Sequence, residues 1–336
     1  MMLGKRKIKG LWFCWFLILP VLFFSMSDLE AQAATKRFSI LGGQVGGSWN
    51  PWASAMSILF TKNIPGYSFS SEAGTGSPEN VRRVNRGEVE TGFGFSGDLY
   101  EAWRGGSIFK TPHQNLRAIT KLFGSVGQVV TLASSDVKEI KDIAGKTIAM
   151  GGPNSGSALT FERFTRHLGL WGKYKPVFLG AGKAVSALGD RQVAAFNWHA
   201  NVAHRVVTQA SVSHKIRLID LGTPAKESGF YDKYPYYGPR TIPAGVIKGV
   251  DKPVPSFQQS TVWTANKDVD PDVVYQMLKE MYSEANKKFL TQSIGIVFEE
   301  MTKDTAFSGI TIPLHPGAER YWKEVGVSIP PKISSN

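Results

Sequence analysis

Cysteine is almost absent from this sequence. The 336 residues include a single cysteine, Cys14, which lies in an apolar stretch near the N-terminus. The remainder of the chain therefore excludes disulfides, thiolate nucleophiles and cysteine-based zinc sites. A chain of this length without disulfides depends on buried apolar side chains for its stability.

The usual signatures of nucleotide binding and catalysis are also missing. Leu41 stands where a G-x-G-x-x-G fingerprint through Gly43 needs glycine, and no Gly-Lys-Ser or Gly-Lys-Thr closes a P-loop. There is no G-x-S-x-G or H-E-x-x-H motif. His199 and His204 are five residues apart, which places them on different faces of a helix and argues against a metal pair. We therefore expect no cofactor, no metal site and no catalytic residue. The sequence does not exclude a Ser–His–Asp triad built from distant residues, so an exported α/β hydrolase is the alternative function.

Long apolar runs are confined to the N-terminus. Four Lys and Arg residues between 5 and 9 precede an apolar run over 11–24, and Ala31-Gln32-Ala33 fits a small-x-small cleavage site. The run is shorter than the about 20 residues of a membrane-spanning helix. We predict a signal peptide over residues 1–33 and export of the remaining chain as a soluble protein.

Acidic residues are fewer than basic ones. The formal net charge is +12, and about +10 remains after removal of the predicted signal peptide. The Lys and Arg residues are scattered, and no nucleic-acid-binding motif is present. We expect a solvated basic surface that favours anionic solutes, and no nucleic-acid partner.

Strands alternate with helices along the chain, a pattern that predicts an α/β fold with mainly parallel sheets. Ser77 is the expected N-cap of one helix, with Pro78 in its first position. Alternating or β-branched runs predict strands over 37–41, 67–71, 91–95, 118–122, 129–133, 146–150, 216–221 and 260–265. Apolar periodicity predicts helices over 52–62 and 81–86, helices ending near 103 and 168, and a largely helical tail from 271.

Three loops, at 46–50, 75–77 and 154–157, each follow a strand and open a helix. Such loops lie at the carboxyl ends of strands, where helix N-termini offer free N–H groups to an anion. Nearby aromatic rings can form apolar pocket walls. For Asp98, capping of its own helix is an equal alternative. We expect a small carboxylate ligand held by Gly47, Ser48, Trp49, Asn50, Thr75, Ser77, Phe95, Ser96, Asp98, Asn154, Ser155, Ser157 and Trp198.

Taken in order, several motifs resemble the TAXI family, the solute receptors of TRAP transporters. They are G-G-S-W-N-P at 46–51, G-S-P-E-N at 76–80, D-I-A-G-K at 142–146 and the Gly156-Ser157 helix start. The most specific stretch is near the C-terminus, where P-L-H-P-G-A at 313–318 precedes R-Y-W-K-E-V-G at 320–326.

The resemblance implies a type II periplasmic-binding-protein fold, in which two α/β lobes flank a central ligand cleft and the chain crosses between them twice. We place lobe 1 at 35–126 and 256–336, and lobe 2 at 127–255. The resemblance further implies a monomeric periplasmic receptor that closes on its solute and delivers it to a TRAP transporter membrane subunit. A binding protein that serves a sensor stays open as an alternative. His315 then has a structural role in a turn.

The sequence departs from the family pattern where the pocket is expected. Trp49 and Asn50 replace two tyrosines, an extra residue lies near Phe95-Ser96-Gly97-Asp98, and the segment 190–196 lacks the glycine and second aspartate of D-G-x-I-D-A-F. Family members are linked to glutamate, glutamine and 2-oxoglutarate. The departures favour a more aromatic or bulkier carboxylate, enclosed by Trp49, Phe95 and Trp198.

Overall fold

The computed structural model describes residues 35–295, 298 and 300–335. The predicted signal peptide lies outside these residues. The first half of the chain forms β1 (Lys36–Leu41), α1 (Trp49–Asn63), β2 (Tyr67–Glu72), α2 (Ser77–Asn85), β3 (Thr91–Phe95), α3 (Ser96–Arg104), β4 (Leu116–Leu132), η1 (Ile140–Ile143), β5 (Thr147–Ala149) and α4 (Gly156–His167). The second half forms β6 (Lys175–Val177), α5 (Ala181–Gly189), β7 (Ala195–Ala200), α6 (Arg205–Ser213), β8 (Ile216–Leu218), α7 (Gly222–Glu227), α8 (Phe230–Lys233), β9 (Gly238–Ile242), β10 (Val254–Asn266), α9 (Pro271–Met281), α10 (Glu284–Ile294), α11 (Pro316–Glu324) and η3 (Pro331–Ile333).

The strands join in the order β2-β1-β3-β10-β4-β7-β5-β6, with β8 beside β4 and β9 beside β10. The pairs around β1 and β5 are parallel. By contrast, β10 is antiparallel to β3, β4 and β9, and β4 is antiparallel to β7 and β8. The prediction of mainly parallel sheets was therefore wrong, because the two longest strands run against their neighbours.

The two strands predicted at 118–122 and 129–133 form one strand, β4. Gly124, Ser125 and Gly127 look like a break in the sequence. In the structure, Gly124 and Ser125 pair with Ser260 and Gln259 of β10, and Gly127 pairs with His199 of β7. The segment is buried on both faces, so pairing on two sides outweighs the low strand propensity of glycine.

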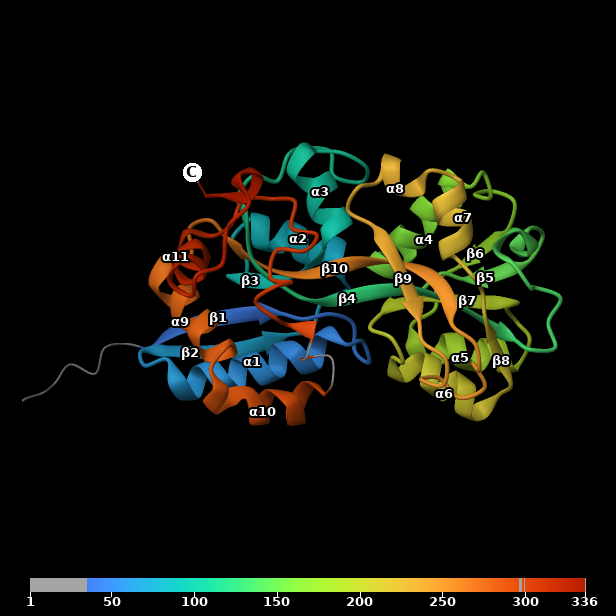
Figure 1. Ribbon diagram of the computed structural model, residues 1–336, viewed down its shortest axis with the longest axis horizontal. Helices are drawn as coiled ribbons and strands as arrows, with labels where there is room; N and C mark the ends of the chain where they lie inside the picture. Colours follow the sequence, from blue (N-terminus) through green and yellow to red (C-terminus); the bar gives the residue numbers. More distant parts are fainter. Residues whose placement is uncertain (1–34, 296–297, 299, 336) are drawn as a thin grey trace, which may run out of the picture. The chain divides into compact units, whose positions relative to one another are not determined.

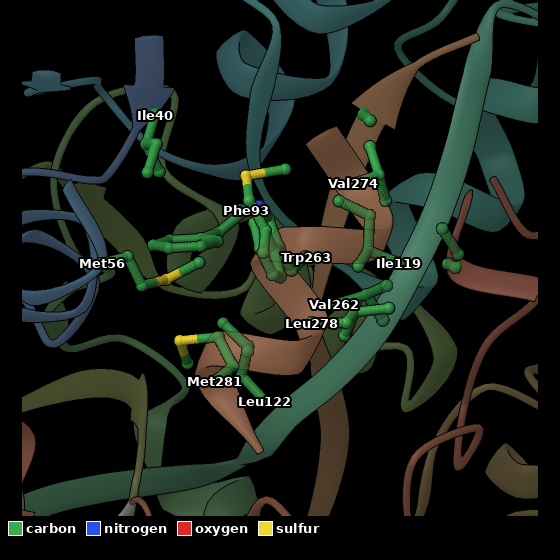
Figure 2. Packing of buried hydrophobic residues seen from close by; sticks show 14 of the residues in the cluster. Ile40, Met56, Phe93, Ile119, Leu122, Val262, Trp263, Val274, Leu278 and Met281 are labelled. Carbon is green, nitrogen blue, oxygen red and sulfur yellow. The ribbon is translucent and has the colours of Figure 1, made fainter. Parts of the chain in front are cut away.

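Apolar side chains form separate cores at the two ends of the paired strands β4 and β10. One cluster draws on residues from 38 to 123 and from 262 to 333, and two more draw on residues from 126 to 257. Figure 2 shows part of the first cluster, where side chains from β1, α1, β3, β4, β10 and α9 gather around Trp263. Trp263 stacks on Phe60 with ring centroids 5.8 Å apart.

The strands β4 and β10 lie side by side (Figure 1). They connect two sets of elements, one packed around the first cluster and the other packed around the other two clusters. The C-terminal part of β10 pairs with β3 and its N-terminal part with β9, while the C-terminal part of β4 pairs with β7. Parallel β-α units around β1 and β5 complete each set. This arrangement confirms the predicted fold class, a mixed α/β fold that matches type II periplasmic-binding proteins.

The C-terminal P-L-H-P-G-A motif is the start of α11. His315 is its N-cap, and its Nδ1 accepts a hydrogen bond of 3.2 Å from the backbone N–H of Gly317. Because Nδ1 accepts, Nε2 carries the proton and donates to the carbonyl of Val269 at 3.0 Å. His315 is fully buried. The prediction of a structural role for this histidine is confirmed.

Gly317 allows α11 to approach α9. A Cβ at position 317 would overlap the backbone carbonyl of Pro271, the first residue of α9. We predict that Gly317→Ala lowers the free energy of unfolding by about 1–3 kcal/mol, as overpacking does elsewhere. Gly182→Ala is the matched control, because Gly182 lies inside α5 with open space around it and should gain up to about 1 kcal/mol. Urea denaturation of both variants checks this, and equal stabilities would contradict it.

Buried histidines make the stability depend on pH. Burial lowers the pKa of His315 to about 4 from its ordinary 6.5. Between these values the unfolded chain binds the proton more readily, so stability is present above pH 6.5 and is lost as the pH falls toward 4. We predict that His315→Asn, which keeps an N-cap residue, removes on the order of 2–3 kcal/mol of this loss. Urea denaturation at pH 4.5, 5.5, 6.5 and 7.5 measures the slope. An unchanged slope in the variant would refute the assignment.

Candidate functional site

Three helix N-termini surround one pocket. They belong to α1, α2 and α4, which follow β1, β2 and β5. The lining residues are Gly43, Gln44, Gly47, Ser48, Trp49, Thr75, Gly76, Ser77, Phe95, Ser155, Gly156, Ser157, Trp198, His199 and Ala200. The first N–H groups of each helix have no acceptor inside the helix, so the pocket receives free donors and three positive dipole ends.

The pocket is small and crosses between the two sets of elements. Its cavity volume is about 60 Å³. At its wall, Gly76 lies so close to Ser155 that a Cβ at position 76 would be 3.3 Å from the Cα of Ser155. A Cβ at Gly156 would be 2.5 Å from the ring of Phe95. The two helix starts therefore meet closely only because glycine occupies both positions.

The pocket brings together nine of the predicted binding residues from five separate parts of the chain. These are Gly47, Ser48, Trp49, Thr75, Ser77, Phe95, Ser155, Ser157 and Trp198. The rings of Trp49 and Phe95 pack edge to face with centroids 4.9 Å apart. The indole of Trp198 stacks on the ring of His204 at 5.9 Å.

Four predicted residues lie outside the lining. Asn50 accepts a hydrogen bond of 2.8 Å from the backbone N–H of Gly43 and so shapes the first loop. Ser96 is fully buried, where its hydroxyl donates to the carbonyl of Tyr236 and accepts from the N–H of Ser260. Asn154 is exposed at a left-handed turn with φ of 55°. These three side chains form turns or fold contacts.

Asp98 is the fourth, and it neither lines the pocket nor caps α3. It is fully buried and forms an ion pair of 3.4 Å with Arg163 of α4. Arg163 also donates a hydrogen bond of 2.7 Å to the hydroxyl of Tyr237. Burial raises the pKa of Asp98, while Arg163 and the hydroxyl of Ser77 oppose the shift. The carboxylate thus joins α3 to α4 behind the pocket.

Ser77 differs from its expected role. The N-cap of α2 is Gly76, with φ of 134°, and Ser77 is the first helical residue. Its hydroxyl accepts a hydrogen bond of 2.9 Å from the buried N–H of Phe95. Replacing Ser77 with alanine would leave that N–H unpaired, at a cost of about 1–3 kcal/mol. A Ser77→Ala variant would therefore perturb folding as well as binding.

His199 lines the pocket, although sequence reasoning considered it only as a metal ligand. It lies on strand β7 opposite Gly127, and His204 precedes α6, so the expected helix carrying both was wrong. Its imidazole packs between Phe95 and Phe257, with centroids 6.3 and 5.2 Å away. Both ring nitrogens are buried without a hydrogen-bond partner. Burial, assisted by Arg163, lowers the pKa of His199 to about 3, so the ring is neutral at neutral pH.

The other lining residues that sequence reasoning missed are mostly small. Gly43, Gly76, Gly156 and Ala200 offer the pocket no functional group on a side chain, and only their places next to predicted residues could have signalled them. Gln44 donates a hydrogen bond of 2.7 Å to the carbonyl of Thr75 and lies against Gly152. It lies in the same loop as Gly47 and Ser48.

Ser157 and His199 are neighbours but do not form a nucleophile–base pair. The hydroxyl of Ser157 donates to the backbone carbonyl of His199 and accepts from its N–H. Within the described part of the chain, no serine hydroxyl bonds to an imidazole nitrogen. The same residues contain no cluster of three His, Cys, Asp or Glu suited to a metal ion. None of their helices has the length and apolar character required to cross a bilayer.

Several solved structures share the general architecture at low identity. SsuA, the periplasmic aliphatic sulphonate binding protein from Escherichia coli, is 15% identical with a TM-score of 0.46, over 86% of this chain and 78% of that one. MatC from Rhodopseudomonas palustris, solved with bound malate, is 13% identical with a TM-score of 0.49, over 77% and 89%. A putative L-cystine ABC transporter from Listeria monocytogenes is 13% identical with a TM-score of 0.49, over 78% and 97%.

Such distant likenesses leave the solute of this chain undecided. A family model gives the stronger assignment. The model of the NMT1-like family matches residues 40–326, which is most of the sequence. The chain therefore belongs to the NMT1-like family.

Proposed function

We propose that this chain is an extracytoplasmic solute-binding receptor that captures a small organic anion in the pocket between α1, α2 and α4. One observation carries the proposal. Two sets of elements with separate cores send helix N-termini into one small cavity. Free N–H groups and positive dipole ends at such termini favour a negatively charged group.

The side chains around the cavity suit the two ends of an organic acid. Ser48 and Thr75 have hydroxyl groups with no described partner in the protein, so they are free to donate to a carboxylate. Trp49, Phe95 and Trp198 present buried rings to the same space. Apolar walls with a few placed donors are typical of small-molecule sites.

The contacts across the pocket support a closing motion. We keep the division into lobe 1 (35–126 and 256–336) and lobe 2 (127–255). Gln44 then reaches from lobe 1 to Gly152 of lobe 2, and Gly76 meets Ser155. A solute that touches both lobes stabilises this closed arrangement over an open one, and the strands β4 and β10 are the segments about which such a hinge would bend.

The receiving partner in this proposal is a TRAP transporter membrane subunit, and the compartment is the periplasm. The support is the order of TAXI-like motifs, with Gly46–Pro51 and Gly76–Asn80 at two of the pocket loops. Delivery to a sensor instead is the second candidate. A gene for a large TRAP membrane subunit beside this one would distinguish the two.

Ser48→Ala and Thr75→Val test the pocket. Each variant removes one hydroxyl that no other described group uses. A hydrogen bond to a charged group contributes about 1.5–3 kcal/mol, so each change should weaken binding by roughly ten- to a hundredfold. Native mass spectrometry of freshly purified protein measures how much co-purified solute each variant retains.

Ser68→Ala is the matched control, since Ser68 is an exposed serine on β2 outside the pocket. It should retain as much solute as the parent chain. Loss of solute in the control, or full retention in both pocket variants, would place the binding site elsewhere. Turnover of any tested compound by the purified protein would contradict a binding role.

A further inference from the structure

We propose that the pocket selects solutes with a single negative charge on a compact and otherwise uncharged body, and that it rejects dianions and zwitterions. This inference rests on the proposed function and narrows it to one class of ligand. It follows from the charge of the pocket wall, the place of the nearest ions and the volume of the cavity.

The wall of the pocket is neutral. Among the described residues that line it, every side chain is a glycine or alanine, a hydroxyl, an amide, an aromatic ring or the imidazole of His199. Burial keeps that imidazole uncharged at neutral pH by lowering its pKa to about 3. Its two unpartnered nitrogens, on a side chain only 5% exposed, offer hydrogen bonds without charge.

The charged groups around the pocket lie outside its lining and bind other groups of the protein. The carboxylate of Glu79, in the first turn of α2, accepts a hydrogen bond of 2.5 Å from the backbone N–H of Thr75. Arg163 lies behind the wall, where Asp98 neutralises it at 3.4 Å and Tyr237 accepts from its second amino group at 2.7 Å. Arg205 is exposed in a neighbouring surface groove and contacts the carbonyl of Gly46 at 3.5 Å. Solvent screens this outer charge. Neither arginine lines the cavity.

One negative charge matches this environment and a second charge of either sign does not. Each of the three helix N-termini acts as about half a positive charge and supplies free N–H groups. A single carboxylate is therefore well stabilised. A second carboxylate, or an ammonium group, would be buried against neutral rings and hydroxyls without a partner, which is costly.

The cavity also limits the size of the solute. Its volume of about 60 Å³ equals roughly two water molecules at liquid density. A cavity of about 150 Å³ is known to hold benzene, so benzoate and pentanoate enter only when the pocket walls move apart. The bulkier carboxylate expected from the sequence is therefore restricted to one ring or a short chain.

The experiment compares probes that differ in charge and share a length. Isothermal titration of the purified protein uses pentanoate, pentanamide, glutarate and 5-aminopentanoate, with benzoate and benzamide as an aromatic pair. We expect pentanoate or benzoate to bind at least tenfold more tightly than its amide, than glutarate and than 5-aminopentanoate. Equal or tighter binding of glutarate or 5-aminopentanoate would overturn the single-charge proposal.

Failure of this inference is distinguishable from failure of the receptor function. Glutarate binding that Ser48→Ala weakens would leave an anion receptor with a different ligand class. If no probe binds, the single-charge class is overturned. The receptor function then stands or falls with the co-purified solute and its loss in the Ser48 and Thr75 variants.

A charge inserted into the wall should reverse the selectivity. Gln44 is half-buried and lines the pocket next to Thr75. We expect Gln44→Lys to raise affinity for glutarate relative to pentanoate at least tenfold, because the ammonium can pair with the second carboxylate. Gln44→Met, of similar size and uncharged, should leave the ratio unchanged. Urea denaturation verifies that both variants are folded, and an unchanged ratio in folded Gln44→Lys would count against a neutral wall as the cause.

Discussion

The antiparallel pairing of β4 with β10 is the constraint on which the rest of this structure depends. The pairing runs from Leu116 opposite Asn266 to Val126 opposite Gln258. Side chains reinforce its middle, where Ser125 and Thr261 share a hydrogen bond of 2.9 Å and the indole of Trp49 donates to Thr261 at 3.3 Å. Because both strands continue past this point into both sets of elements, they set where the helix N-termini of each set can meet.

The polar groups behind the pocket show how the fold keeps charge away from it. Asp98 and Arg163 are both deeply buried, and a buried ion is tolerated only with partners. Arg163 pairs with one carboxylate oxygen of Asp98 and donates to the hydroxyl of Tyr237, and neither ion lines the cavity. The wall itself retains hydroxyls, backbone N–H groups and a neutral imidazole. This division fits a site that recognises an anion by dipoles and hydrogen bonds and uses no fixed cation.

Local signals in the sequence were sufficient for many elements and for much of the pocket. Strands at β1, β2 and β3 and the helix α1 follow from short alternating or periodic runs between glycines and prolines. The loops at 46–50, 75–77 and 154–157 could be recognised because a strand, a glycine and a helix start follow one another there. Asn50, Asn154, Ser96 and Asp98 could not be separated from the lining residues, since which way a loop side chain points depends on distant partners such as Ser260 and Arg163.

By itself, the sequence determined that the chain is an α/β protein without disulfides, that its strand-to-helix loops carry donors, and that its C-terminal motif belongs to a structural turn. These properties depend on residue type and on spacing along the chain. Only the tertiary structure decided that β4 is one strand, that His199 faces the pocket between two phenylalanine rings, and that the pocket wall is neutral. Each of these depends on contacts between residues tens to hundreds of positions apart, where pairing and desolvation outweigh local preference.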